Sequence, residues 1–204
     1  RSGADALVYT TFLGGGDEEY GNAIAVDAAG QLYVTGYTRS ENFPVTSNPL
    51  QAVRQGGYEA FISRINPDAG ASGLTWSTYY GGSSTDVGTA IAVDGQGRIY
   101  MGGYTHSSNF PTGNDPFQGE YSGSADGFVV RVDPSRQALD AIDRGTFLGG
   151  SGIDFVYAIH LGANEVVHAT GYTTSDNFPT AGNAPQTRFG GIADAFVARI
   201  DHTI

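Results

Sequence analysis

Six carboxylates recur at matching places along this chain and are the residues best suited to chemistry. The first series is Glu19, Asp86 and Asp154, and the second is Glu59, Asp126 and Asp194. Carboxylates on neighbouring loops can supply the oxygen ligands that Ca²⁺ prefers, or they can work as the acid and base of glycoside hydrolysis. The alternative is structural: each carboxylate caps backbone N–H groups or pairs with Arg64, Arg131 or Arg199.

An acid that is repeated in every unit fits a structural role in each unit better than a single catalytic centre. The sequence therefore predicts no catalytic residue, no bound cofactor and no clear metal site. Ca²⁺ is the one ion for which these six carboxylates remain candidates, and any ligand is expected on their side of the blades.

A nine-residue motif, here called the nonapeptide, shows that the chain is built from repeats. It reads GYTRSENFP at Gly36–Pro44, GYTHSSNFP at Gly103–Pro111 and GYTTSDNFP at Gly171–Pro179, and the copies start 67 and 68 residues apart. A fixed period of this kind indicates stacked copies of one supersecondary unit. The repeats run approximately over residues 5–68, 72–135 and 140–202 of a single segment, 1–204.

Each repeat contains four short segments that are rich in Val, Ile, Tyr, Phe and Thr. The first segment occurs at 23–27, 90–94 and 158–161, and the second at 32–38, 99–105 and 166–173. The third occurs at 60–65, 127–132 and 195–200, and the fourth at 7–13, 74–80 and 142–148. Such segments predict strands. Four antiparallel strands per repeat are typical of a β-propeller blade, so the expected fold is all-β with three propeller blades. A parallel β-helix is the alternative, although its period is usually shorter.

The turn between the first two strands has an Asp and a Gly in two of the three copies. Asp27–Gly30 and Asp94–Gly97 predict hairpin turns, because Asp accepts local backbone bonds and Gly takes positive φ. The third copy, Gly162–Glu165, has neither residue at these places. Asn164 is expected to supply the left-handed conformation there.

These motifs together resemble a known family. The combination TFLGG, AIAVD, GYTxSxNFP and DAFVxRI is similar to the SBBP-type β-propeller repeat of bacterial surface and secreted proteins. The resemblance implies blades of large extracellular proteins, with no established enzyme activity and no catalytic residues to carry over. We therefore expect a non-enzymatic structural or interaction segment of a bacterial extracellular or cell-surface protein, such as a scaffold, an adhesin or a subunit of a surface assembly. A carbohydrate-binding module is the alternative, and a propeller hydrolase or lyase is a remote one.

The overall charge and hydropathy exclude several partners. The net charge is −11, from 10 Lys plus Arg against 21 Asp plus Glu, which disfavours nucleic acid and anionic membranes. No apolar stretch approaches the ~18 residues of a membrane span. The expected partner is a protein, with a glycan as the second possibility.

Twenty residues separate the second and third strands in every copy, and each such segment carries Asn-Phe-Pro. Phe43, Phe110 and Phe178 have two interpretations. Either their loops form an interaction surface, or their rings pack between the blades as hydrophobic plugs.

The alternating apolar residues predict the core, and the chain ends predict the contacts. Residues expected to be buried are Ile24, Val26, Ile91, Val93, Phe61, Phe128 and Phe196. The chain begins on an outer strand with Leu7, Tyr9 and Phe12 and ends on a third strand, 195–200. Three blades are fewer than the usual four to eight, so we expect residues 7–13 to pair with the last strand of another copy or of further repeats in a longer parent. Two copies would close a six-bladed ring.

Overall fold

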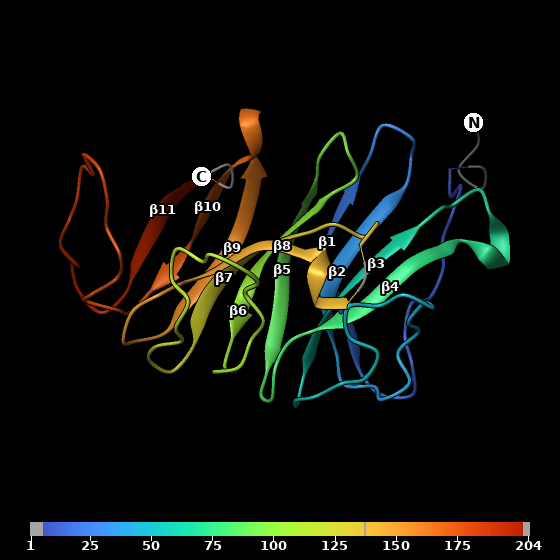
Figure 1. Ribbon diagram of the computed structural model, residues 1–204, viewed down its shortest axis with the longest axis horizontal. Coiled ribbons are helices and arrows are strands. Elements are labelled where there is room, and N and C mark those ends of the chain that lie inside the picture. Colours follow the sequence, from blue (N-terminus) through green and yellow to red (C-terminus); the bar gives the residue numbers. More distant parts are fainter. Residues whose placement is uncertain (1–5, 137, 202–204) are drawn as a thin grey trace.

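The computed structural model describes residues 6–136 and 138–201, and these residues form three antiparallel sheets that stack along the chain (Figure 1). We call the sheets blades 1, 2 and 3. Blade 1 contains β1 (Glu19–Val26), β2 (Leu32–Thr38), β3 (Glu59–Ile65) and β4 (Leu74–Tyr80). Blade 2 contains β5 (Asp86–Val93), β6 (Ile99–Thr105), β7 (Asp126–Val132) and β8 (Ile142–Leu148). Blade 3 contains β9 (Asp154–Leu161), β10 (Val166–Thr173) and β11 (Asp194–Asp201).

The only helical pieces among the described residues are three short 3₁₀ turns: η2 (Gly70–Ser72), η3 (Ala138–Ala141) and η4 (Ala163–Glu165). None of them approaches the length and apolar character that a membrane-crossing helix would need. In η4 the expected left-handed residue is present, since Asn164 has a φ of 54°. The all-β propeller-blade architecture is thus confirmed.

The sheets are offset from the sequence repeats. Within each blade the strands follow chain order, but β4 lies beyond the first sequence repeat and completes blade 1. In the same way β8 completes blade 2 after the second sequence repeat ends. Among the described residues blade 3 has no fourth strand, so β11 is its outer edge.

Two apolar layers join the three blades. Between blades 1 and 2 the buried residues include Tyr33, Trp76, Ile91, Met101 and Phe128. Between blades 2 and 3 they include Tyr100, Val129, Val156, Val167 and Phe196. The predicted burial of Phe61, Phe128, Phe196 and Ile91 is confirmed, and Val93 is half-buried.

The prediction that Ile24 and Val26 are buried is wrong. Their side chains are 61% and 57% exposed. They occupy the places in β1 that Ile91 and Val93 occupy in β5, and blade 1 covers the latter two. No blade among residues 6–136 and 138–201 covers the outer face of blade 1, so the same pattern gives exposed residues there.

The predicted strand over residues 7–13 is not formed. This segment has no β-ladder partner in the structure, and Leu7, Tyr9 and Phe12 are exposed. Only its last residue, Leu13, packs against the protein, beside the cluster of Phe43, Phe61 and Tyr79. A strand needs a neighbouring strand for its hydrogen bonds, and among the described residues this segment has none.

Candidate functional site

The polar residues of the nonapeptide hold the loop that connects successive blades. Thr105 Oγ1 donates a hydrogen bond to Asp86, and Ser107 Oγ donates another to Asp86 Oδ2 at 3.0 Å. Ser107 Oγ also accepts the Ser84 N–H at 2.8 Å, and Asn109 Oδ1 accepts the Ser83 N–H at 2.9 Å. The nonapeptide thus ties the start of β5 to the loop before it.

The other copies repeat this arrangement. In the first copy Ser40 Oγ and Asn42 Oδ1 accept the N–H groups of Asp17 and Gly16. In the third copy Ser175 Oγ and Asn177 Oδ1 accept the N–H groups of Gly152 and Ser151. These Ser and Asn residues were visible in the repeated phrase, but the sequence interpretation used only its Phe.

The recurring carboxylates meet in pairs at the junctions between blades. Asp126 begins β7 in blade 2 and Asp154 begins β9 in blade 3, and both side chains are fully buried. They converge on Gly149: Asp126 Oδ1 and Asp154 Oδ2 lie 2.6 and 2.9 Å from the point where a β-carbon of this residue would be. An acid of the second series thus lies beside the first-series acid of the next blade.

Glu59 and Asp86 form the same pair at the junction of blades 1 and 2. Both are buried, and both approach the β-carbon position of Gly81. Asp194 and Glu19, the remaining members of the two series, stand at opposite ends of the chain and are half-buried. Two such pairs therefore lie within the chain, and among the described residues Asp194 and Glu19 have no acidic counterpart of this kind.

A glutamine completes each internal pair. Gln51 Nε2 donates to Glu59 Oε1 at 2.5 Å, and Gln51 Oε1 accepts the Gly81 N–H at 3.1 Å. Gln118 lies in the same way between Asp126 and the Gly149 N–H. Sequence reasoning missed these glutamines, although Gln51, Gln118 and Gln186 recur with the period of the repeat.

Burial raises the pKa of three of these acids, Glu59, Asp86 and Asp126. It raises the pKa of Glu59 to about 7, and the neighbouring Asp86 carboxylate adds to the effect. Burial also raises the pKa of Asp126 to about 7, with a further contribution from Asp154. The pKa of Asp86 is raised as well, chiefly by burial. Two carboxylates enclosed together cannot both be charged without a large electrostatic cost, so a proton held at the junction relieves it.

The paired carboxylates cap backbone N–H groups and do not line an open site. Glu59 Oε2 accepts the backbone N–H groups of Gln55 and Gly56, and Asp126 Oδ2 accepts that of Ser122. Capping of backbone N–H groups is the structural alternative that the sequence analysis gives for these carboxylates. Because the paired side chains are fully buried, a substrate could reach them only after the glycine loop moved.

A groove runs along the free edge of blade 3, and we call it the β11 groove. It has a volume of about 1200 Å³. Its lining includes Leu148, Phe178, Pro179, Gln186, Phe196 and Ala198. The groove therefore lies between β11, the loop that follows the third nonapeptide and the end of β8.

In the other two blades a fourth strand fills the corresponding place. The Tyr79 N–H of β4 donates to Gln51 O at 3.3 Å, and Thr78 Oγ1 accepts the Gln51 N–H at 2.9 Å. In blade 2 the Phe147 N–H donates to Gln118 O at 3.1 Å. In each complete blade the fourth strand thus hydrogen-bonds both to the third strand and to the loop that precedes the third strand.

The family model for the SBBP β-propeller repeat matches residues 8–44 and 75–111. The chain contains repeats of the SBBP family. Each matched segment runs from the fourth-strand sequence to the Pro of the nonapeptide, so an SBBP unit spans the junction between two blades. The sheets show a third copy of the unit at the junction of blades 2 and 3.

Part of this chain is similar to a curated protein. Over 117 residues the chain is 30% identical to the regulatory protein FlaEY of Caulobacter vibrioides. The alignment covers 57% of this chain and 11% of that protein. The chain thus matches only a small part of FlaEY.

The aromatic residue of the SBBP nonapeptide is a packing residue. Phe110 lies with its ring centre 4.3 Å from that of Phe128 and 5.2 Å from that of Tyr80, which belongs to blade 1. Phe43 is likewise buried, and Phe178 packs against Phe196. The rings of Phe43 and Phe110 are therefore buried packing residues and do not present a surface to a partner, and Phe110 alone of the three packs against another blade among these ring contacts. The interaction role of the three loops stays a prediction.

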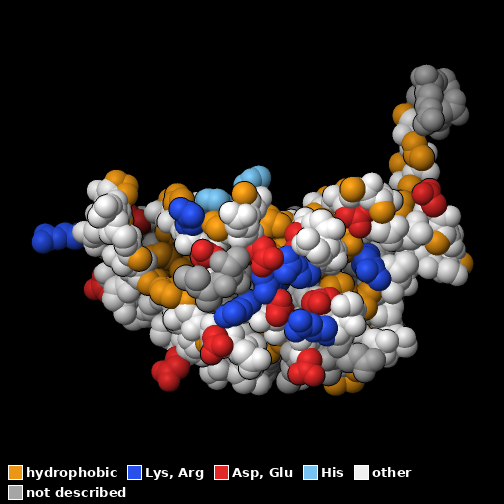
Figure 2. Space-filling view, turned by 45° about the horizontal axis from the view of Figure 1, so that its top comes forward, with side chains coloured by type: hydrophobic (Ala, Val, Ile, Leu, Met, Phe, Trp, Pro, Cys, Tyr) orange, Lys and Arg blue, Asp and Glu red, His pale blue; other side chains and the backbone are white. Residues whose placement is uncertain are grey.

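Arg131, in the third strand of blade 2, forms ion pairs with acids outside the two recurring series. Arg131 Nη2 lies 2.5 Å from Asp143 Oδ2, and Arg131 also pairs with Glu165 of blade 3. Arg98 joins the same Glu165 at 2.5 Å. Figure 2 shows basic and acidic side chains gathered over the middle of one face. Arg131 therefore joins blades 2 and 3 through Glu165 and pairs with Asp143 within blade 2.

Proposed function

We propose that this chain is a non-enzymatic interaction segment of a bacterial extracellular or cell-surface protein. Its role is to assemble with further blades into a larger propeller that serves as a scaffold. The observation that carries the proposal is the pair of open ends. Blade 1 exposes Ile24 and Val26 on one end face, and blade 3 exposes the free edge of β11 and Val197 on the other.

Both ends favour association with protein. Apolar side chains on a sheet face gain free energy when another sheet covers them, as the layers between the internal blades already do. A free strand edge presents unpaired N–H and C=O groups to another strand. Another blade satisfies both requirements at once.

Other observations support the same role. The repeats of this chain resemble the SBBP repeats of bacterial surface and secreted proteins, which favours an extracellular location. The partial similarity to a protein named as regulatory is compatible with protein binding. Five of the six recurring acids accept a backbone N–H, which favours a structural role for Glu59, Asp86, Asp126, Asp154 and Asp194.

Light scattering after size-exclusion chromatography, over a range of concentrations, tests the assembly. We expect particles larger than one chain, with a mass that rises with concentration. Replacing Ile24 and Val26 by Asp should shift the particles toward the single-chain mass, while circular dichroism retains the strand signal. A single-chain mass for the intact protein at every concentration would contradict the proposal. Protease treatment of whole cells that produce the parent protein tests the location, because only a surface protein is cleaved.

A further inference from the structure

We propose that the β11 groove binds residues 7–13 of a second copy of this chain, with Phe12 as the anchor. The inference rests on the proposed assembly and adds its register, its anchor residue and the identity of the partner. The bound segment would become the fourth strand of blade 3 in the other copy.

The first argument is an identical pentapeptide. Thr11–Gly15 and Thr146–Gly150 both read TFLGG. Thr146–Leu148 ends β8, the fourth strand of blade 2, and the two glycines lead into blade 3. The N-terminal copy of this sequence leads into blade 1 in the same way.

The loop after the N-terminal pentapeptide already has the conformation of an internal junction. The Gly16 N–H donates to Asn42 Oδ1 at 2.8 Å, as the Ser151 N–H donates to Asn177 Oδ1 at 2.8 Å. Leu13 packs beside Phe43 and Phe61, as Leu148 belongs to the layer that contains Phe196. Residues 7–12 therefore emerge where the fourth strand of a preceding blade would lie.

The second argument is the environment of Phe12. Its side chain is 103% exposed, whereas Phe147 at the same place in the pentapeptide is 1% exposed. Phe147 is buried beside Phe110 and Phe128, whose ring centres are 4.3 Å apart. The β11 groove offers the corresponding pair, Phe178 and Phe196, at 4.6 Å. Burial of an exposed phenylalanine against two aromatic rings is strongly favourable.

The internal blades also give the hydrogen-bond register. Gln186 in the groove corresponds to Gln118, which binds the Phe147 N–H through its carbonyl and Thr146 Oγ1 through its N–H. We therefore expect the Phe12 N–H to donate to Gln186 O and Thr11 Oγ1 to accept the Gln186 N–H. In this register Glu19 of one copy meets Asp194 of the other and forms the missing carboxylate pair.

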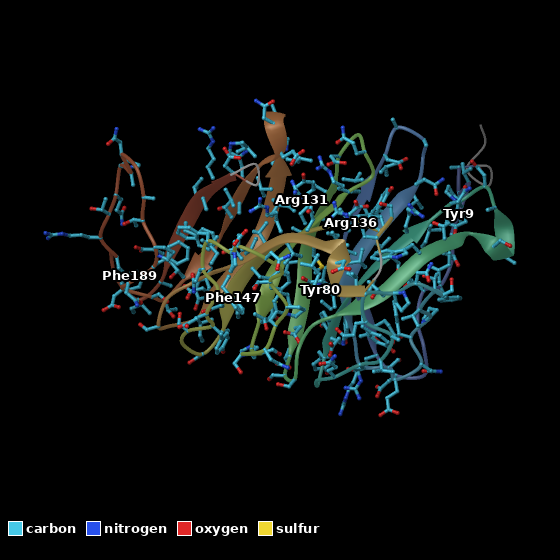
Figure 3. All side chains as sticks on the ribbon, viewed as in Figure 1. Tyr9, Tyr80, Arg131, Arg136, Phe147 and Phe189 are labelled. Carbon is cyan, nitrogen blue, oxygen red and sulfur yellow. The ribbon has the colours of Figure 1, made fainter. Side chains whose placement is uncertain are left out.

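The groove cannot take the N-terminal segment of its own chain. Blade 1 and blade 3 lie at opposite ends of the stack, with Tyr9 at one end and Phe189, beside the groove, at the other (Figure 3). A second copy can present its N-terminal segment to the groove, and its own groove is then available in return. Reciprocal exchange gives six blades, within the usual range of four to eight for closed propellers.

A labelled peptide tests the groove. The probe is the peptide of residues 6–16, ALVYTTFLGGG, and its fluorescence anisotropy is measured with full-length chain that carries Phe12→Ala. Phe12 is fully exposed in the single chain, so this substitution should leave the circular dichroism strand signal unchanged while it disables the chain's own segment. We expect saturable binding, at least ~10-fold weaker when the peptide carries the same Phe→Ala change. Equal binding of the two peptides, or none, would overturn the inference.

Light scattering of the Phe12→Ala chain separates this inference from the broader proposal. We expect the variant to have the single-chain mass at concentrations where the intact chain assembles. If the variant assembles as well as the intact chain, association through the blade faces stands and the strand exchange is wrong. If the intact chain has the single-chain mass at every concentration, both are wrong.

Discussion

Asp126 and Asp154 come from two successive blades, and their carboxylates enclose Gly149 from both sides, at 2.6 and 2.9 Å from its β-carbon position. Oδ1 of each is buried and, among the described residues, has no hydrogen-bond partner. Glu59 and Asp86 repeat the arrangement one blade earlier. The junctions between blades therefore contain both the glycine turns and the groups whose charge opposes close packing.

The stability of the blade stack should fall as the pH rises from about 4 to about 7. The folded-state pKa of Asp126 is about 7, above its ordinary value of 3.8, so the folded chain binds this proton more tightly than the unfolded chain. The resulting stabilisation is fully present below pH ~4 and is lost as the pH rises through ~7. After allowance for solvent screening the loss is on the order of 2 kcal/mol for this group. Urea titrations across this pH range measure it.

Asp126→Asn is the variant that isolates the effect. The amide keeps the shape of the side chain without a charge at neutral pH, so the decrease in unfolding free energy between pH 4 and 7 should become smaller. Asp68→Asn, at an exposed turn, is the matched control and should retain the full decrease. An unchanged pH profile in Asp126→Asn would show that the junction does not hold the proton.

The glycine that begins the nonapeptide should tolerate no side chain. A β-carbon on Gly103 would collide with the carbonyl oxygen of Val87 and lie 2.6 Å from Cζ of Phe128. Gly103→Ala should therefore lower the free energy of unfolding by about 3 kcal/mol or more. Gly95→Ala is the control, because nothing lies within 4 Å of its β-carbon position. Equal stability of the two variants in denaturant titrations would show that β5 and β6 are not so closely paired.

Equivalent residues of blades 1 and 2 should differ sharply in their effect on stability. Ile91→Ala removes a side chain that is 8% exposed and should cost about 2–5 kcal/mol. Ile24→Ala removes a side chain that is 61% exposed and should change the stability of the single chain by about 0.5 kcal/mol. Thermal melts at low concentration measure both. A large loss from Ile24→Ala under these conditions would mean that the outer face of blade 1 is covered even in the single chain.

The contrast between Ile24 and Ile91 also shows what the sequence can predict. Strand positions, the turn at Asn164 and the period of the blades follow from local preferences, so the repeats revealed them. The burial of a residue depends on whether another blade lies over it, and the two isoleucines have the same local pattern. Which strands share a sheet also depends on pairing. The residues of β4 lie in the second sequence repeat, but β4 pairs with β3 and completes the sheet of the first.

The candidate site was predicted only by residue type. The repeated acids were visible in the sequence, but their pairing across a junction was not, because Glu59 and Asp86 belong to different blades. Gln51 was missed because a lone amide gives no chemical signal. Its role depends on reaching both the Glu59 carboxylate and the Gly81 N–H.

Calcium should not stabilise the chain. At the junction of blades 2 and 3 one oxygen of each acid accepts hydrogen bonds: Asp154 Oδ2 from the Gly150 N–H at 2.8 Å and from Ser175 Oγ at 2.7 Å, and Asp126 Oδ2 from the Ser122 N–H at 2.8 Å. Donors around an anion stabilise its charge but occupy the places that a cation would need. We therefore expect the melting temperature to be the same, within about 1 °C, with millimolar Ca²⁺ and with a chelator at matched ionic strength. A saturable rise with Ca²⁺ that Asp154→Asn abolishes would instead establish a metal site at the junction of blades 2 and 3.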